Sequence, residues 1–441
     1  MKKYQRSITS ELQKRLDEPV SSIIMMAGPR QVGKTTAVHQ VLGARVEDPY
    51  IFYAVDSPES EPTKLFPRPS ELGEVLKTDS TIRDKNWLVQ VWQKARIDAL
   101  NWQKKQREQN AFRNVKLPFK PYVLALDEIQ KIKDWSSVVK GLWDADRLNE
   151  VPLHVVILGS APLLLQKGLN ESLAGRFELL RVTHWSYSEM QEAFDFTLNE
   201  YIYFGGYPRP AALSLTKDHQ RWSAFVKASL IESNIDKDIL SLVRVEKPAL
   251  LRQLFELGSR YSGQIVAVTK LVGQLQEAGN TTTLTHYLQL LQHAGLIAGL
   301  HKYSAQKIRQ RAAPPKLNVL NTAFQSVDSG LTFAEAQADK HFWGRLVESA
   351  VGAHLLNTAG PSMEVSYWRE SPVEVDFVLH TGAKLCAIEV KSSNKFAVPK
   401  GLDAFARINP ESTTLVVGGS DHALALALST PAADWFSLAE F

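Results

Sequence analysis

The sequence predicts an α/β protein that begins with a parallel sheet covered by helices, continues through a helical and winged-helix region, and ends in a smaller α/β region. Three observations predict this order. Short apolar runs alternate with helical segments over the first 190 residues, the periodicity is helical from about 200 to 300, and strands return after Pro314 and Pro315. We therefore expect domains at 1–200, 201–312 and 313–441.

Four apolar runs predict the sheet of the first domain. Each run is short and nearly continuous, as strands buried in a parallel sheet require, and they occupy 21–28, 50–56, 122–128 and 153–160. Between the second and third runs, residues 87–108 place apolar side chains at helical spacing. This segment predicts a long helix within an insertion at 81–120.

The middle region contains the pattern of a winged helix-turn-helix. Residues 280–303 have the features of a helix cap, a helix with leucines directed inward, and a strand after Gly295. A basic loop and the return strand KLNVLN follow, which gives the order helix, strand, wing, strand. The expected wing spans 301–316. The last region is predicted to hold one helix at 342–356 and strands near residues 364, 374, 385 and 414.

Composition excludes several classes of protein. With 441 residues, 44% hydrophobic and 22% charged, the chain is ordinary for a globular protein and has no run of the roughly 18 apolar residues that a membrane span needs. Its first residues lack the apolar core of a secretory signal, so we expect a cytoplasmic protein that does not enter a membrane. The single Cys386 excludes an internal disulfide and a cysteine-rich zinc site.

The charge is unevenly distributed along the chain. A formal net charge of +4 points to no class of partner, yet residues 81–120 hold ten Lys or Arg against three acids, and the wing 301–316 holds five with no acid. Runs of this kind can neutralise the phosphates of DNA. The first run also contains Trp87, Trp92 and Trp102, which either stack on exposed bases or belong to the core.

A glycine-rich loop follows the first predicted strand. Residues 28–35 fit the pattern G-x-x-x-x-G-K-[ST] and lead directly into a predicted helix. Backbone amides of such a loop bind phosphates, Lys34 neutralises the β and γ oxygens of ATP, and the Thr35 hydroxyl is a ligand for Mg²⁺. The predicted nucleotide contacts are Gly28, Pro29, Arg30, Gln31, Val32, Gly33, Lys34, Thr35 and Thr36. A chance glycine turn is the alternative, and the next motif disfavours it.

The third predicted strand ends in two acids. The segment YVLALDEIQ places Asp127 to hold Mg²⁺ and Glu128 to orient and polarise the water that attacks the γ-phosphate. A solvated strand end is the alternative. The strand at 153–160 ends in Ser160, for which we predict a role as a polar sensor of the γ-phosphate, with a helix N-cap as the competing interpretation.

A second group of acids lies in a predicted hairpin of the last region. A two-residue turn of type II′ at 382–383 pairs residues whose numbers sum to 765, so that Asp376 faces Glu389. Strand alternation then directs these carboxylates and Lys391 to one face. Two carboxylates can share a divalent metal, Mg²⁺ or Mn²⁺, and Lys391 can steady a hydroxide or an oxyanion.

The same alternation directs Glu374 to the acidic face, and Val375, Phe377 and Cys386 to the core. On the helix before the hairpin, Glu348 lies between small residues one turn away on either side, so that its carboxylate is accessible as a third metal ligand. The alternative is a solvated hairpin whose acids and lysine only form cross-strand ion pairs.

Taken together, these motifs resemble one family. The segments GPRQVGKTT, LDEIQKIKDW, LGSAPLLLQKGLNESLAGRFE, YFGGYP and EVDFVL…IEVKSS look like the bacterial and archaeal AAA+-type ATPases with a C-terminal domain of unknown function that is restriction-endonuclease-like. The resemblance covers nearly the whole chain. It implies the D…E-x-K metal site of PD-(D/E)XK nucleases, with Glu348 as the helix glutamate.

The resemblance also implies a role for Arg176, at the end of the segment SLAGR. This arginine would present its charge to nucleotide, either in its own subunit or across a ring interface. A surface arginine paired with Glu171 or Glu178 is the alternative. Two features depart from the family: the insertion at 81–120 is longer than expected, and KLNVLNTAF stands where its members usually show a strand end that contains Asp.

Three functions are consistent with these predictions. The first is an ATP-driven homo-oligomer or ring that acts on DNA, including branched or repair intermediates, through the winged helix, the basic runs and a nuclease-like domain. The second is a nucleotide-gated switch that remodels a protein partner, in which the last domain only binds. The third is a degenerate ATP binder without turnover.

Overall fold

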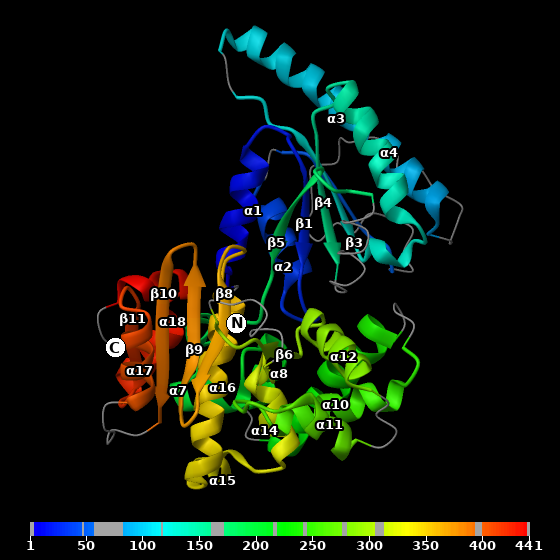
Figure 1. The fold of residues 1–441 in the computed structure, drawn as a ribbon. Helices are drawn as coiled ribbons and strands as arrows, with labels where there is room; N and C mark the ends of the chain where they lie inside the picture. Colours follow the sequence, from blue (N-terminus) through cyan, green and yellow to red (C-terminus); the bar gives the residue numbers. More distant parts are fainter. Residues whose placement is uncertain are drawn as a thin grey trace. The chain divides into compact units, whose positions relative to one another are not determined.

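A computed structural model describes residues 4–45, 48–56, 83–115, 118–159, 172–214, 218–240, 245–275, 280–304, 313–392 and 399–438. The chain folds into two compact units, Met1–Val182 and Thr183–Phe441. Figure 1 shows a sheet with helices in the first unit, and a helical part and a second sheet in the second unit. Among the described helices, none is long and apolar enough to cross a membrane.

The first unit is built on a five-stranded parallel sheet. Its strands are β1 (Ile23–Ala27), β2 (Tyr50–Ala54), β3 (Tyr122–Asp127), β4 (Leu153–Gly159) and β5 (Phe177–Arg181), in the order β2-β3-β4-β1-β5. Every neighbouring pair is parallel. The four strands that the sequence predicts are confirmed, and β5 is an additional edge strand. Because parallel strands end at one edge, the glycine-rich loop after β1 and the acids at the end of β3 lie at the same edge.

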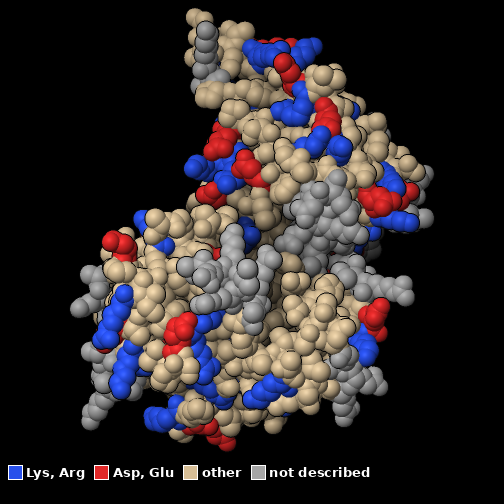
Figure 2. Space-filling view, in the orientation of Figure 1, with Lys and Arg blue, Asp and Glu red and all other residues tan. Residues whose placement is uncertain are grey.

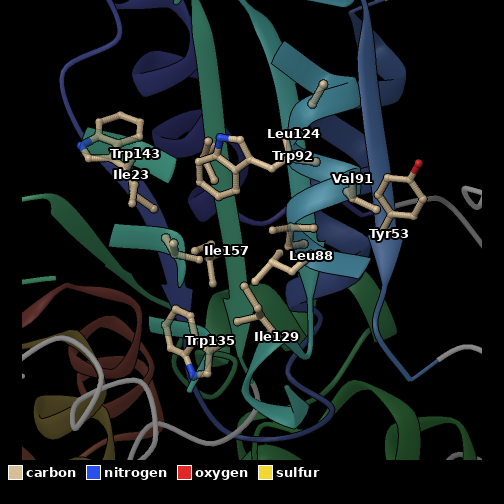
Figure 3. Close-up of a cluster of buried hydrophobic side chains, with 14 of the residues drawn as sticks. Ile23, Tyr53, Leu88, Val91, Trp92, Leu124, Ile129, Trp135, Trp143 and Ile157 are labelled. Atoms are coloured by element: carbon tan, nitrogen blue, oxygen red, sulfur yellow. The ribbon is translucent and has the colours of Figure 1, made fainter. Parts of the chain in front are cut away.

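Helices cover this sheet on both faces (Figure 1). α1 (Ser7–Asp17) packs on α2 (Lys34–Ala44), and the predicted long helix, α3 (Lys85–Arg113), packs on β3 and on α4 (Trp135–Leu148). Figure 3 shows Trp92 and Leu88 of α3 in one apolar cluster with Ile157 of β4. The insertion therefore supplies a large part of the core of the first unit.

The tryptophans of α3 belong to this core. Trp87 and Trp92 are 1% and 0% exposed, and the Trp92 Nε1 donates a hydrogen bond of 2.6 Å to Oδ2 of Asp146. Trp102 is half-buried, and its Nε1 donates to the carbonyl oxygen of Lys120. The interpretation that Trp87 and Trp92 stack on DNA bases is therefore wrong, because both rings are buried.

The second unit contains the predicted winged arrangement. α10 (Pro248–Arg260), α11 (Val268–Gln274) and α12 (Thr281–His293) precede an antiparallel pair, β6 (Ile297–Leu300) and β7 (Lys316–Val319). The order helix, strand, loop and return strand is as predicted, although residues 305–312 of the wing lie outside the described residues. Before this arrangement the chain forms α6 (Tyr187–Phe194), α7 (Leu198–Phe204), α8 (Pro208–Ser214), α9 (His219–Phe225) and π-helical turns at Val226–Glu232 and Ile235–Leu240.

A four-stranded sheet forms the last part of the second unit. β8 (Glu364–Glu370), β9 (Val373–Thr381) and β10 (Lys384–Lys391) form an antiparallel meander, and β11 (Thr413–Gly418) joins β10 in parallel after α17 (Lys400–Ile408). α16 (Lys340–Thr358) packs on both β10 and β7. The helix and the four strands confirm the prediction for this region. The remaining helices are α14 (Thr322–Ser329), α15 (Phe333–Ala338) and α18 (Asp421–Ser429).

The β9–β10 hairpin has the predicted register. Its pairs run from Lys384 with Thr381 to Ile388 with Phe377, and each pair of numbers sums to 765 as expected. Gly382 has a φ of 56°, the positive value that a type II′ turn needs at its first central position. A glycine at this position therefore determines how the two strands align.

A β-bulge in β9 interrupts the predicted alternation of faces. On the neighbouring strand β8, Ser366 pairs with Val378 but Trp368 pairs with Val375, so β9 contains one more residue than β8 over this interval. As a result, Val375 and Val378 lie in the same apolar cluster, together with Phe405 of α17.

The bulge also turns Asp376 toward α16. Phe377 lies next to Gly352 of α16, and the Nζ of Lys316 contacts both the Phe377 ring and Oδ1 of Asp376. The prediction that Val375 and Phe377 share a core face opposite Asp376 is therefore wrong. The carboxylate of Asp376 lies within the packed layer between the sheet and α16 instead of on a solvated face.

Candidate functional site

The glycine-rich loop is held by two cations in the first unit. Lys34 is 6% exposed, and its Nζ donates hydrogen bonds to the carbonyl oxygens of Gly28 at 2.9 Å and Pro29 at 2.6 Å. Arg6 donates from Nη1 to the carbonyl oxygen of Val32 at 2.9 Å. Both interactions fix the backbone whose amides would face phosphate. No pattern in the sequence points to Arg6, which is a single cation far from the motif.

The first glycine of the loop is required by close backbone contact. A Cβ at Gly28 would lie 1.8 Å from the carbonyl oxygen of Val182. Val182 is fixed there because its amide donates a hydrogen bond of 2.8 Å to the carbonyl oxygen of Ala27. The loop therefore passes directly over the chain that follows β5, and no side chain fits between them.

The structure brings two predicted magnesium ligands together. The Thr35 hydroxyl donates a hydrogen bond of 2.6 Å to Oδ2 of Asp127. Burial raises the pKa of Asp127 above its usual range, and the hydrogen bond from Thr35 opposes this shift. A desolvated carboxylate beside a hydroxyl is an oxygen-rich pair of the kind that a small divalent cation prefers, so these residues fit Mg²⁺.

Glu128 adopts an unusual backbone conformation next to Asp127. Its φ of 58° lies in the left-handed region, which costs a residue with a side chain about 1–3 kcal/mol and is common at functional sites. Its amide donates to the carbonyl oxygen of Leu158 in β4 at 3.1 Å, and its Oε2 accepts from Nε2 of Gln130 at 2.9 Å. Gln130, which sequence reasoning missed, thus helps to orient the predicted catalytic carboxylate.

The other predicted residues of the first unit lie elsewhere. Ser160 is outside the described residues, one position beyond the end of β4, which lies between β1 and β3. Arg176 precedes β5, and its carbonyl oxygen accepts from the amide of Ile23 at the start of β1. Since β1 spans about 16 Å at roughly 3.3 Å per residue, Arg176 lies at the edge of the sheet opposite the glycine-rich loop.

The guanidinium of Arg176 has a partner in the same unit. Its Nε and Nη2 donate to the two carboxylate oxygens of Asp144 at 2.7 Å and 3.0 Å. The alternative interpretation of Arg176 is a surface pair with Glu171 or Glu178. Arg176 does form a surface pair, but its partner is Asp144. The Arg176–Asp144 pair is partly exposed, and a surface pair of this kind contributes little to the stability of a fold.

In the second unit, the predicted metal ligands surround a buried lysine. The Nζ of Lys316 lies 2.5 Å from Oε1 of Glu348 and 3.4 Å from Oδ1 of Asp376, and it also donates to the carbonyl oxygen of Asp376 at 3.0 Å. Burial alone would lower the pKa of Lys316, but Asp376 and Glu348 raise it above its usual value. Burial raises the pKa of Glu348 to about 7, against the attraction of Lys316.

The remaining two predicted residues form a pair beside this cluster. The Nζ of Lys391 donates to Oε1 of Glu389 at 2.7 Å, and burial raises the pKa of Glu389. Oδ2 of Asp376 accepts from the amide of Val390 at 2.9 Å, which brings the bulge next to β10. In the part of the chain that the structure describes, no group of three or more His, Cys, Asp or Glu side chains is arranged to hold a metal ion.

Several predicted basic residues have ion-pair partners. Lys85 pairs with Asp134, Arg96 with Asp146 and Lys120 with Asp48. In the wing, Lys302 pairs with Glu370, and Lys316 is buried, so neither is a free phosphate contact. The other wing cations, Lys307, Arg309 and Arg311, lie outside the described residues.

Three family models match separate parts of the chain. An AAA domain matches residues 85–191, a domain of unknown function (DUF8612) matches 195–332, and a second one (DUF4143) matches 343–433. The AAA match contains the acidic strand β3. The glycine-rich loop lies before the matched residues in the sequence and follows β1, which is separated from β3 by β4 in the sheet. The AAA match lies largely within the first unit, whose parallel sheet also carries the glycine-rich loop. The DUF4143 match contains Glu348, Asp376, Glu389 and Lys391.

Relatives and solved structures are similar to this chain over larger parts of its length. Two uncharacterized proteins, Mb2031c of Mycobacterium bovis and Rv2008c of Mycobacterium tuberculosis, are each 23% identical over 282 residues, which is 64% of this chain and 61% of theirs. A Walker-type ATPase of Pyrococcus abyssi, paby2304, has 12% identity and a TM-score of 0.46 over 74% of this chain and 95% of its own. A RuvB variant of Thermotoga maritima has 17% identity and a TM-score of 0.29 over 66% and 86%.

Proposed function

We propose that the protein hydrolyses ATP with Mg²⁺ and uses the nucleotide cycle to act on DNA. The observation that carries the ATPase part is the contact of the glycine-rich loop with the acidic strand, through Thr35 and Asp127. Thr35 and Asp127 would hold Mg²⁺, which neutralises charge on the phosphates and favours in-line displacement. The finer claim, action on DNA, rests on surface charge and on the winged arrangement.

In the proposed hydrolysis, some residues bind the phosphates and others position the attacking water. The backbone N–H groups of residues 28 and 30–36 and the ammonium of Lys34 bind the phosphates, for which Lys34 exchanges its contacts with Gly28 and Pro29 for phosphate oxygens. Glu128 orients and polarises the attacking water, and Gln130 holds the Glu128 carboxylate in position. Lys34, Asp127 and Gln130 are buried, which strengthens their interactions with nearby charges.

The far half of α3 supports a DNA contact. Among the described residues, no carboxylate lies within ion-pair distance of four exposed cations in the helix, Lys104, Lys105, Arg107 and Arg113. Figure 2 shows Lys and Arg side chains gathered at the top of the view, over the end of α3. Unpaired cations along one helix can each neutralise a phosphate, which produces affinity that falls steeply with salt.

The winged arrangement supplies a second surface of suitable chemistry. α12 follows α11 as the recognition helix follows the first helix in a helix-turn-helix. Its exposed side chains are hydroxyl, amide and imidazole groups, which can read base edges: Thr281, Thr282, Thr285, His286, Gln289, Gln292 and His293. We propose that α12 and the wing contact DNA together.

Measurement of ATPase rates tests this proposal. We expect duplex, forked or single-stranded DNA to raise the ATPase rate. We also expect the full-length protein to bind at least one of these DNAs, with a logarithm of the binding constant that falls linearly with the logarithm of the salt concentration. A protein that hydrolyses ATP but shows neither stimulation nor salt-dependent binding would keep the ATPase assignment and lose the DNA assignment.

A nucleotide-gated remodeller of a protein partner is the second candidate. The ion pairs of Lys302 and Lys316 within the second unit favour it, because they remove two of the five wing cations from contact with phosphate. Two results together would support this alternative. ATP turnover would be insensitive to DNA, and a Glu128→Gln variant with bound ATP would retain a partner protein that the wild-type protein releases.

We also propose that the chain assembles into a homo-oligomer in which Arg176 serves a neighbouring subunit. The support is its position at the edge of the sheet opposite its own glycine-rich loop. A mixing experiment tests it: Lys34→Ala and Arg176→Ala are each expected to be inactive, and a mixture should regain activity because one subunit supplies the loop and the other the arginine. Failure to regain activity after subunit exchange would contradict a role in trans.

A further inference from the structure

The carboxylates of the second unit converge on an internal cation. Lys316 is the first residue of β7, and its ammonium reaches Glu348 on α16 and Asp376 at the bulge of β9. The side chain is 5% exposed, so water contributes little to its solvation. Three separate elements thus deliver one lysine and two acids to one buried point.

Four carboxylate oxygens of the cluster already have partners. Oε1 of Glu348 and Oδ1 of Asp376 face the ammonium of Lys316, Oδ2 of Asp376 accepts from the amide of Val390, and Oε1 of Glu389 accepts from Lys391. Two ammonium groups therefore accompany three carboxylates. A divalent ion would face strong repulsion from a lysine that lies within hydrogen-bond distance of two of its ligands.

We propose that Lys316 is a built-in cation that takes the place of a divalent metal in the C-terminal carboxylate site. The site is therefore closed to Mg²⁺ and Mn²⁺ as long as β7 holds its position. Lys316 joins the winged arrangement to the C-terminal sheet, since β7 is at once the return strand of the wing and the source of the buried ammonium.

Electrostatics also predicts what happens without the lysine. Removal of one partner from a buried ion pair leaves an uncompensated charge, here on Glu348 and Asp376. Oε2 of Glu389 is buried and makes no hydrogen bond within the described residues, so it is a further oxygen available to a cation. A neutral residue at position 316 should consequently convert the cluster into an oxygen-rich metal site.

The test is a count of Mn²⁺ bound by the full-length protein without nucleotide, made by electron paramagnetic resonance of the free ion. Wild type and Lys316→Met are compared, because methionine keeps most of the side-chain volume and removes the charge. We expect Lys316→Met to bind one more Mn²⁺ per chain than wild type, at least about tenfold more tightly than any weak binding of wild type. Addition of Asp376→Asn should abolish the extra ion.

Each outcome decides the question. An extra ion in Lys316→Met that Asp376→Asn removes supports the proposal. A wild-type protein that binds Mn²⁺ and loses it on Asp376→Asn substitution overturns it, and this comparison needs no variant at position 316. A folded Lys316→Met protein without the extra ion also overturns it. The count does not depend on ATPase activity or on DNA, so its failure is distinguishable from failure of the proposed function.

Discussion

The hydroxyl of Thr35 lies 2.6 Å from Oδ2 of Asp127 and donates a hydrogen bond to it. This contact joins the start of α2 to the end of β3, two elements that are distant in the sequence and adjacent at one edge of the sheet. This edge of the sheet is therefore held together by a direct contact between the two predicted magnesium ligands. Nucleotide and metal would enter an arrangement whose ligands already touch, which reduces the entropy lost on binding.

Substitution Lys34→Ala should abolish nucleotide binding. The ammonium donates hydrogen bonds to the carbonyl oxygens of Gly28 and Pro29, and its loss removes these two contacts together with the proposed neutralisation of phosphate charge. Binding of a fluorescent ATP analogue provides the measurement, with Lys14→Ala on the exposed surface as a control. Unchanged affinity in a folded Lys34→Ala protein would contradict the assignment of the loop.

Substitution Glu128→Gln should preserve ATP binding and lower kcat by about 10²–10⁴-fold, because the amide cannot polarise the attacking water as the carboxylate does. Gln130→Ala should lower kcat less and leave KM nearly unchanged, since Gln130 only holds Oε2 of Glu128. Steady-state kinetics separate the two effects. If Gln130→Ala instead raised KM and left kcat unchanged, Gln130 would contact the nucleotide and would not orient Glu128.

The stability of the second unit should fall in mild acid because of His354. Its Nε2 lies 2.7 Å from the carbonyl oxygen of Thr430, and burial lowers the pKa of His354 to about 4 from an ordinary value of 6.5. The unfolded chain therefore takes up a proton first. Stability is complete above pH 6.5 and is lost as the pH falls toward 4, by at most about 3 kcal/mol.

Urea unfolding at a series of pH values provides the measurement. His354→Gln keeps a side-chain N–H donor and has no proton to gain, so it should flatten this part of the pH dependence. An equally steep loss of stability in the variant would assign the effect to other groups, including His154 of the first unit, whose pKa burial also lowers to about 4.

Neutralisation of Lys104, Lys105 and Arg107 to alanine should weaken DNA binding without lowering basal ATPase activity. Each phosphate contact contributes about 0.9 to the salt slope, so loss of all three should reduce its magnitude by as much as about 2.7. Fluorescence anisotropy with labelled duplex at several salt concentrations measures the slope. Lys85→Ala is the matched control, because that exposed lysine of α3 is paired with Asp134. Equal effects of the two variants would rule out a specific contact by the far half of α3.

Local patterns were enough to predict four of the five strands in the sheet of the first unit and the hairpin of the second. Continuous apolar runs predict buried parallel strands, and the turn at Gly382 fixes a register that depends only on the two strands it joins. The same reasoning failed at Asp376, because the bulge arises from pairing of β9 with β8, on its other side. Strand alternation contains no information about an extra residue imposed by a neighbour.

Partners distant in the sequence were the other source of error. The basic residues around Lys316 in the sequence indicate a solvated wing. In the structure, Lys316 belongs to β7 and its side chain is directed inward, where Glu348 and Asp376, more than 30 residues away, compensate its charge. Arg6 and Gln130 likewise gain their roles only from the fold. A charge count along the chain cannot distinguish a cation that is solvated from one that is buried among acids.

The carbonyl oxygen that excludes a side chain at Gly28 belongs to Val182, the last residue of the first unit. The polypeptide thus leaves this unit in direct contact with the glycine-rich loop. Any rearrangement of that loop when ATP arrives or when phosphate departs would act on the covalent exit to the rest of the molecule within one residue. Communication between the units could then begin at the backbone itself, without an intervening chain of side-chain contacts.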